Sequence, residues 1–211
     1  MLVAVLIDGF NLYHHMDNDR YRKYKWLNFN KLFRNYINKS DQPEIHYFTT
    51  IYYEDTIEYR RNPKKIEGKL RRHLNLIQAE KSYGVFVHYG EFKIREFVCE
   101  KCRHKNLIWQ EKQTDVNLGS YLIYLAFSRD LDNFIILSAD SDLIAAIKLV
   151  KENSDSKKIR LLLPPGISKS AISKYCDHTH EFTDSILSDS LFPLIFTNKK
   201  GETISYPLEW R

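Results

Sequence analysis

The stretch that decides the fold stands at the start of the chain: Leu2-Val3-Ala4-Val5-Leu6-Ile7-Asp8-Gly9. Its apolar residues form one continuous run instead of alternating with polar residues, which is typical of a strand covered by helices on both faces. The run ends in Asp8-Gly9, so a carboxylate directly follows the strand. We therefore expect a central strand of a parallel sheet that delivers Asp8 to the sheet edge.

Strand and helix patterns alternate along the rest of the chain. Further strands are expected at residues 44–53, 85–88, 92–98, 107–109, 134–137 and 158–163, and helices are expected to begin at Asn28, Asn62-Pro63, Thr114 and Ser141. This alternation predicts an α/β fold with a mainly parallel central sheet, right-handed crossovers and helices on both faces. We expect one domain over residues 1–185 with a small β insertion at 90–110. Residues 186–211 are expected to form a tail or β-hairpin packed on that domain.

Four aspartates are expected at one edge of this sheet. Asp8 follows the first strand, and Asp140 and Asp142 follow the strand at 134–137. Asp115 lies in the first turn of a crossover helix, and such helices begin at the carboxyl edge of the strands, where sheets of this kind bind ligands. Crowded carboxylates raise one another's pKa unless cations sit among them, and Mg²⁺ or Mn²⁺ suits an all-oxygen site.

Such a site can hydrolyse a phosphodiester, because the ion activates water, polarises a phosphoryl oxygen and stabilises the leaving alkoxide. Asn11 and Ser138 are placed to orient water or support a ligand, and Lys112 to contact a phosphate. Simpler interpretations exist for each residue: the aspartates cap helices or form turns, Asn11 and Ser138 satisfy loops, and Lys112 is a solvated lysine. These interpretations do not explain four aspartates at one edge.

Basic residues are concentrated in the segment RRNPKKIEGKLRRH, residues 60–73, which holds seven Lys or Arg against one acid in a chain of net charge +5. Such a charge favours an anionic partner. The helical spacing of Ile66, Leu70, Leu74 and Ile77 is expected to turn the basic side chains towards solvent. We predict a surface that contacts a phosphate backbone, with a solvated helix face as the alternative. Its residues are Arg60, Arg61, Lys65, Lys69 and Arg72.

The pair Cys99-x-x-Cys102 has the spacing of half a zinc site. A second pair does not follow, and no spacing argument selects the remaining ligands from His73, His88, His104 and Cys176. A structural Zn²⁺ and two reduced thiols on a turn therefore both stay open.

Three motifs together resemble the NYN-domain family of PIN-like nucleases: Ile7-Asp8-Gly9-Phe10-Asn11-Leu12, Lys112-Gln113-Thr114-Asp115 and Ser138-Ala139-Asp140-Ser141-Asp142. The resemblance covers roughly residues 1–165 and implies a PIN-like Rossmannoid fold with metal-dependent ribonuclease activity. It implies that Asp8, Asp115, Asp140 and Asp142 match the family's acidic positions, and that Asn11 matches its polar neighbour. Ala139 stands where the family usually carries glycine, and this difference removes no metal ligand. Relatives often carry a cysteine-bearing insertion just before the second motif.

Several other classes of protein are disfavoured. No apolar run approaches the roughly 20 residues that span a bilayer, and the opening run does not resemble a secretory signal. We therefore expect no membrane partner. Three cysteines do not make a disulfide framework, so we expect a cytoplasmic protein. Phe10 stands where an aspartyl phosphatase needs its second acid, and phosphate-binding glycine motifs are absent.

RNA, as single strands or structured loops, is the expected partner. Two alternatives stay open: a non-cleaving RNA-binding or assembly module of the same fold, and a nuclease that acts on DNA, since aspartate-bound metals attack either backbone. A homo-oligomer is also left open.

Overall fold

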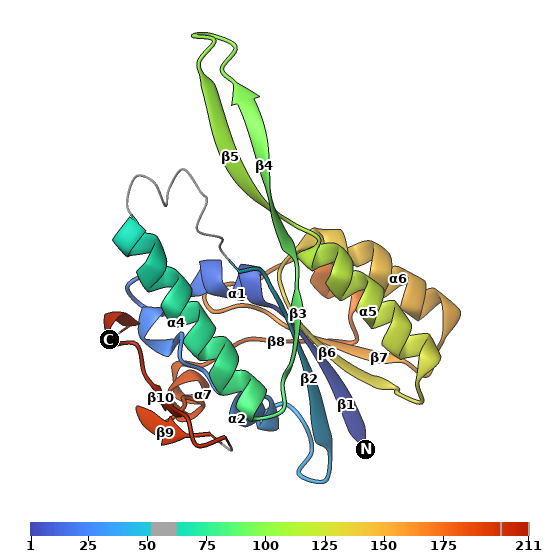
Figure 1. The fold of residues 1–211 in the computed structure, drawn as a ribbon. Helices are drawn as coiled ribbons and strands as arrows, with labels where there is room; N and C mark the ends of the chain where they lie inside the picture. Colours follow the sequence, from blue (N-terminus) through green and yellow to red (C-terminus); the bar gives the residue numbers. More distant parts are fainter. Residues whose placement is uncertain (52–62, 199, 211) are drawn as a thin grey trace.

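A six-stranded parallel sheet lies at the centre of the computed structural model, which describes residues 1–51, 63–198 and 200–210. The strand order is β3-β2-β1-β6-β7-β8 (Figure 1). The strands are β1 (Leu2–Asp8), β2 (Gln42–Thr49), β3 (Phe86–Tyr89), β6 (Asn133–Leu137), β7 (Lys158–Leu162) and β8 (His178–His180). All neighbouring strands in this sheet pair in parallel, and β1 lies between β2 and β6. The α/β fold class predicted from the sequence is confirmed.

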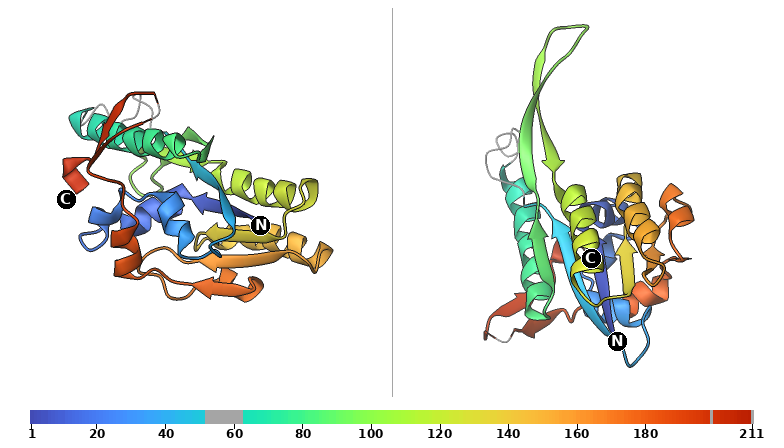
Figure 2. Two further views of the ribbon diagram at one scale, coloured as in Figure 1. Left: turned by 90° about the horizontal axis from the view of Figure 1, so that it is seen from below. Right: turned by 90° about the vertical axis from the view of Figure 1, so that its right-hand side faces the viewer.

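Helices cover both faces of the sheet (Figure 2). The helices are α1 (Gly9–Met16), α2 (Phe29–Arg34), α4 (Pro63–Ser82), α5 (Thr114–Ser128), α6 (Ile144–Asn153) and α7 (Asp184–Asp189). Side chains of α1, α2, α4 and α7 share one apolar core, and side chains of α5 and α6 share the other. Within β1, Val5 and Ile7 enter the first core and Leu6 enters the second. The continuous apolar run is therefore explained, because successive residues of a strand face opposite sides. No helix in the described ranges is long and apolar enough to cross a membrane.

Two of the predicted helix starts agree with the structure. The Oδ1 of Asn28 accepts a hydrogen bond from the Lys31 backbone N at 3.0 Å and caps α2. Pro63 is the first residue of α4, and Asn62 lies outside the described residues. At the third start, Ser141 opens the short 3-10 helix η2 (Ser141–Leu143), which leads directly into α6.

A two-stranded arm leaves the body of the molecule after β3 (Figure 1). In this arm β4 (Glu91–Val98) pairs antiparallel with β5 (Lys105–Lys112). At its base stands Gly90, where a Cβ atom would lie 2.5 Å from the Thr114 Oγ1 and 2.7 Å from the Lys112 carbonyl oxygen. Only glycine permits this close approach. The arm is the expected β insertion, and its second strand is longer than the 107–109 pattern indicated.

The C-terminal segment packs against α4 through its own apolar cluster. The antiparallel hairpin of β9 (Ile195–Thr197) and β10 (Thr203–Ser205) agrees with the expected terminal hairpin. Leu76 and Ala79 of α4 join this cluster, while Leu74 is 40% exposed. The expectation that Leu74 faces the core was wrong. The buried side of α4 is formed by Ile77, which packs in the core beside the sheet, and by Leu76 and Ala79, which pack on the C-terminal segment. The cluster consists of Trp26, Leu76, Ala79, Phe192, Ile204, Tyr206 and Trp210.

Candidate active site

The carboxyl ends of β1 and β6 form the point at which the topology of the sheet reverses. The two strands pair in parallel, with Ile7 beside Leu137. From β1 the chain continues to β2 and β3 on one side, and β6 to β8 build the other side. In open α/β sheets a crevice for ligands forms at such a reversal. Asp8 and the Ser138-Ala139-Asp140 segment lie there, directly after Ile7 and Leu137.

Asp8 is held in place by two hydrogen bonds and is only 6% exposed. Its Oδ1 accepts from the Asn11 backbone N at 2.9 Å, which caps α1, and its Oδ2 accepts from the Ser138 Oγ at 2.9 Å. The next residue is a glycine for steric reasons, since a Cβ on Gly9 would lie 2.6 Å from the Phe48 carbonyl oxygen. The helix after β1 therefore starts pressed against β2, and Asp8 points towards the neighbouring strand β6.

Asp140 is joined to Asp8 through Ser138. The fully buried Ser138 Oγ accepts from the Asp140 backbone N at 3.0 Å while it donates to Asp8. The Asp140 Oδ1 accepts from the Asp142 backbone N at 3.0 Å and caps η2. A second tie comes from the Asn11 Oδ1, which accepts from the Ala139 backbone N at 3.1 Å. Asn11 and Ser138 thus connect the loop after β1 with the loop after β6.

Electrostatics single out Asp8 among the acidic side chains of this site. Its pKa is raised from 3.8 to about 6, mainly by burial. The hydrogen bonds from Asn11 and Ser138 oppose this rise, and the negative charges of Asp140 and Glu111 add to it. A carboxylate of this kind is stabilised in its ionised form by any cation placed beside it. A cation beside Asp8 would therefore offset the cost of ionising this buried carboxylate.

Glu111 is a residue of this site that sequence reasoning missed. It lies on β5, its charge acts on Asp8, and its Oε1 accepts from the Thr114 backbone N at 3.1 Å. The predicted cap at Thr114 was wrong: α5 begins with Thr114 itself, after Gln113 in a left-handed conformation with φ of 78°. Glu111 takes over the cap because this turn directs its carboxylate back to the helix start. An acid three residues before Thr114 was the available signal.

The other two predicted metal ligands occupy different surroundings. Asp115 is half-buried in the first turn of α5, and Asp142 is exposed in η2, which α5 contacts. Within residues 1–51, 63–198 and 200–210, no three His, Cys, Asp or Glu side chains lie close enough to hold one metal ion. The structure thus links Asp8 and Asp140 through Ser138, and the participation of Asp115 and Asp142 stays a prediction. The carboxylate donor set matches the ligand preference of Mg²⁺ or Mn²⁺.

The predicted basic surface is only partly within the described chain. Arg60 and Arg61 lie outside the described residues, and Lys65 belongs to α4. Lys69 and Arg72 line a cavity between α4 and α1. The expectation that both turn to bulk solvent was wrong for this reason: this side of α4 faces α1. Lys112, at the end of β5, is exposed.

Cys99 and Cys102 lie at the tip of the arm. The Cys99 backbone N donates to the His104 carbonyl oxygen at 2.9 Å, and Arg103 occupies the left-handed region with φ of 59°. Hydrogen bonds from Cys102 and from the Lys101 backbone lower the pKa of the Cys99 thiol. The part of the chain that the structure describes brings no third ligand to the pair. Zinc binding at Cys99 and Cys102 stays a prediction.

Comparisons with known proteins agree with this architecture. The family model described as the NYN domain matches residues 2–187. A solved structure of a Vibrio parahaemolyticus protein of unknown function superimposes with a TM-score of 0.53 at 15% sequence identity, covering 90% of this chain and 96% of that one. At this identity the likeness shows the fold alone. No curated protein matches the sequence.

Proposed function

We propose, from the premise that this chain belongs to the NYN-domain family of PIN-like nucleases, that it hydrolyses RNA phosphodiester bonds at the site around Asp8 and Asp140. One observation carries the proposal. The buried Asp8, with its pKa raised to about 6, is joined through Ser138 to the loop of Asp140 at the reversal point of the sheet. A turn at the end of β1 needs only one acid as a cap. A second acid whose charge acts on the first is repulsive, and a bound cation would relieve this repulsion.

Divalent metal is the cofactor that this proposal requires. Asp8 and Asp140 would hold a Mg²⁺ or Mn²⁺ ion together with Asp115 or Asp142, and the ion would supply an activated water and a counter-charge for the phosphate. Ser138 and Asn11 keep the two acidic loops in register through their hydrogen bonds. Exposed Lys112 would contact a phosphate of the strand. Glu111 adds negative charge at the same site.

RNA is proposed as the substrate on the strength of the family and of the net charge of +5. The free thiols of Cys99, Cys102 and Cys176 fit a reducing compartment, and we propose the cytoplasm. DNA hydrolysis is the alternative activity. A non-cleaving RNA-binding module is favoured by a separate observation, because Asp8 and Asp140 both also serve as helix caps.

The proposal is tested by cleavage of end-labelled single-stranded RNA and DNA with Mg²⁺, Mn²⁺ or EDTA. Wild type is compared with Asp140→Asn and with the control Asp130→Asn, an exposed acid before β6 at the opposite edge of the sheet. We expect RNA cleavage that needs metal, persists in the control and is lost in Asp140→Asn. Retention of RNA without cleavage by wild type would contradict the nuclease and favour the binding module.

A further inference from the structure

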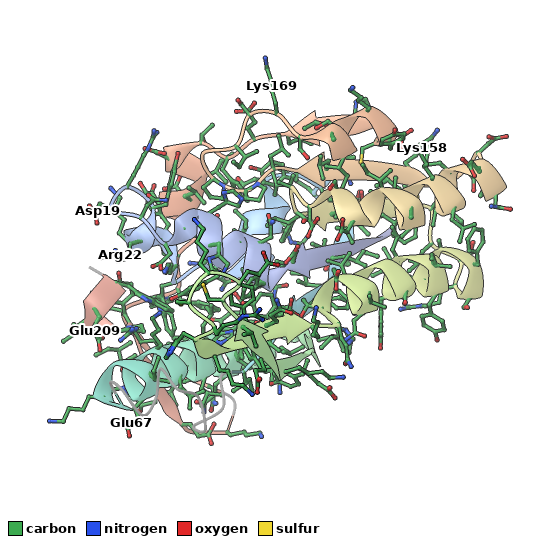
Figure 3. The ribbon with its side chains drawn as sticks, turned by 90° about the horizontal axis from the view of Figure 1, so that it is seen from above. Asp19, Arg22, Glu67, Lys158, Lys169 and Glu209 are labelled. Atoms are coloured by element: carbon green, nitrogen blue, oxygen red, sulfur yellow. The ribbon has the colours of Figure 1, made fainter. Side chains whose placement is uncertain are left out.

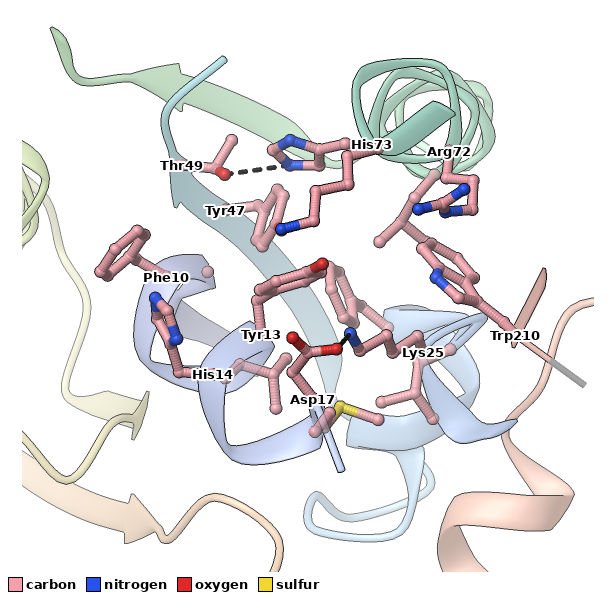
Figure 4. A pocket seen from close by; sticks show the side chains of 17 residues that line it. Phe10, Tyr13, His14, Asp17, Lys25, Tyr47, Thr49, Arg72, His73 and Trp210 are labelled. Atoms are coloured by element: carbon pink, nitrogen blue, oxygen red, sulfur yellow. Dashed lines mark hydrogen bonds and ion pairs between the residues drawn. The ribbon is translucent and has the colours of Figure 1, made fainter. Parts of the chain in front are cut away.

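A cavity of about 110 Å³ lies next to the candidate active site (Figure 4). Its wall begins at Gly9 and Phe10, the two residues that follow Asp8, and continues along the inner side of α1. The end of β2, the face of α4 around His73 and the C-terminal Trp210 complete it. A single buried water needs roughly 10–15 Å³. The cavity is therefore large enough for a ring-sized group, and it lies beside the residues that follow Asp8.

The floor of the cavity is apolar and aromatic. Side chains from distant parts of the chain meet there, among them Leu12 of α1, Phe29 of α2, Tyr47 of β2, Leu76 of α4 and Trp210. The rings of Phe29 and Tyr47 lie with their centroids 5.2 Å apart. Aromatic walls accept a flat ring with little loss of side-chain entropy, since stacking on a π-face tolerates any base.

Basic side chains line the cavity as well. The cavity is lined by Lys25, Lys69 and Arg72 against one carboxylate, Asp17. Lys25 forms an ion pair with Asp17 and a cation–π contact with Tyr13. Its Nζ lies 2.5 Å from the Asp17 Oδ1 and 3.8 Å from the centre of the Tyr13 ring. Lys69 and Arg72 provide the remaining positive charge.

His73 adds no charge to this side of the cavity, whereas Glu209 partly neutralises Arg72. Burial lowers the pKa of His73 to about 4, so His73 is neutral at pH 7, and its Nε2 hydrogen-bonds the Thr49 Oγ1 at 3.1 Å. Arg72 lies 3.2 Å from the carboxylate of Glu209, which stands beside α4 and is shared with Arg71 (Figure 3). An incoming anion can therefore draw on Lys69 and Arg72 while Arg71 retains Glu209.

We propose that this cavity binds one unstacked nucleotide of the RNA substrate, with the base on the aromatic floor and its phosphate on Lys69 and Arg72. The inference rests on the proposed nuclease function, which it deepens. The apolar floor disfavours a bare phosphate, and the paired cations disfavour an uncharged apolar ligand. A base can enter such a cavity only after it leaves a stack, so the substrate is a single strand, a loop or an end and not a continuous duplex.

The test measures binding in EDTA, so that it does not depend on cleavage. The four ribonucleoside 5′-monophosphates, inorganic phosphate, a short single-stranded RNA and the same RNA in a duplex are titrated calorimetrically into the full chain. We expect one or more nucleotides to bind more tightly than inorganic phosphate, and the single strand more tightly than the duplex. Equal binding of inorganic phosphate and nucleotides would overturn the base site.

Matched variants locate the binding. Arg72→Met and Lys69→Met should each weaken nucleotide binding about tenfold or more, as expected for a lost charge-assisted hydrogen bond. Lys81→Met is the control, because Lys81 is an exposed cation of the same helix that does not line the cavity. Thermal midpoints within a few degrees of wild type establish that the variants fold. Equal binding by all three variants would contradict the proposal.

The two proposals fail in different ways. If RNA is cleaved but the cavity variants leave both nucleotide affinity and the KM for single-stranded RNA unchanged, the nuclease stands and the cavity proposal is overturned. If nucleotides bind with the expected loss in Arg72→Met but RNA is never cleaved, the cavity proposal is supported and the nuclease is overturned.

Discussion

Replacement of Asp8 by asparagine should stabilise the metal-free protein at neutral pH. The Asp8 carboxylate is 6% exposed, and its pKa lies at about 6 against an ordinary value of 3.8. At 1.36 kcal/mol per pH unit, this difference corresponds to on the order of 3 kcal/mol that ionised Asp8 costs the folded state. Asparagine is nearly isosteric and can still accept from the Asn11 backbone N, while Ser138 can act as acceptor to its amide. Asp8→Asn should therefore raise the free energy of unfolding by up to about 3 kcal/mol.

The pH dependence of this effect follows from linkage. Between pH 3.8 and about 6 the folded protein holds a proton on Asp8 that the unfolded chain has lost, so the stability of wild type falls across this window as pH rises. Below it, both states are protonated and Asp8→Asn should bring little gain. Above about pH 6 the cost is fully present, and the stabilisation by asparagine should reach a plateau.

Urea unfolding in EDTA at pH 4, 5, 6, 7 and 8 measures the difference, with Asp130→Asn as the control. This exposed acid should change stability by no more than about 0.5 kcal/mol. Addition of Mg²⁺ or Mn²⁺ should then stabilise wild type more than Asp8→Asn, because only the carboxylate gains a cation. An Asp8→Asn protein less stable than wild type at pH 8 in EDTA would refute the reasoning and would show that Asp8 acts mainly as a structural cap.

Three further predictions concern separate parts of the molecule. Ser138→Ala should lower the free energy of unfolding by about 1–3 kcal/mol, because buried groups on both sides of its hydroxyl lose their partner, and it should slow any metal-dependent cleavage; urea unfolding and initial rates measure the two effects. Gly9→Ala should cost about 1–3 kcal/mol through the contact of its Cβ with the Phe48 carbonyl oxygen; a thermal midpoint equal to that of wild type would count against this packing. Iodoacetamide at pH 7.5 should alkylate Cys99 well before Cys176, since hydrogen bonds lower the pKa of the first thiol and burial raises that of the second to about 12; peptide mass spectrometry that finds Cys176 modified first would contradict this order.

Most of the fold could be predicted because it depends on local patterns. The run at residues 2–7 predicted a buried central strand, and its alternate residues do enter two different cores. Asn28 and Pro63 indicated helix starts through their own chemistry. The prediction failed at Thr114, where the cap comes from Glu111, and at Leu74, which is exposed. At Thr114 the capping acid stands only three residues earlier, but the left-handed turn at Gln113 that brings it back could not be read from the pattern. At Leu74 the outcome depends on how α4 packs against distant segments, which a local pattern does not contain.

The candidate site divides in the same way. Asp8, Ser138 and Asp140 could be proposed as neighbours because each follows a strand of one parallel sheet, and the structure joins them. The convergence of Asp115 and Asp142 on the same ion stays a prediction. The contribution of Glu111 required the arm to return to the body of the molecule, which its β pattern alone did not indicate.

The sequence by itself determined the order of strands and helices, the acids at the strand ends and the positive charge of α4, because these follow from neighbouring side chains and their spacing. Only the tertiary structure decided which surfaces meet. It turned Lys69 and Arg72 towards α1, brought Trp210 from the far end of the chain to the same cavity and buried Asp8 enough to raise its pKa. The physical reason is that periodicity orients a side chain relative to its own helix or strand, whereas burial and charge environment depend on packing between distant segments.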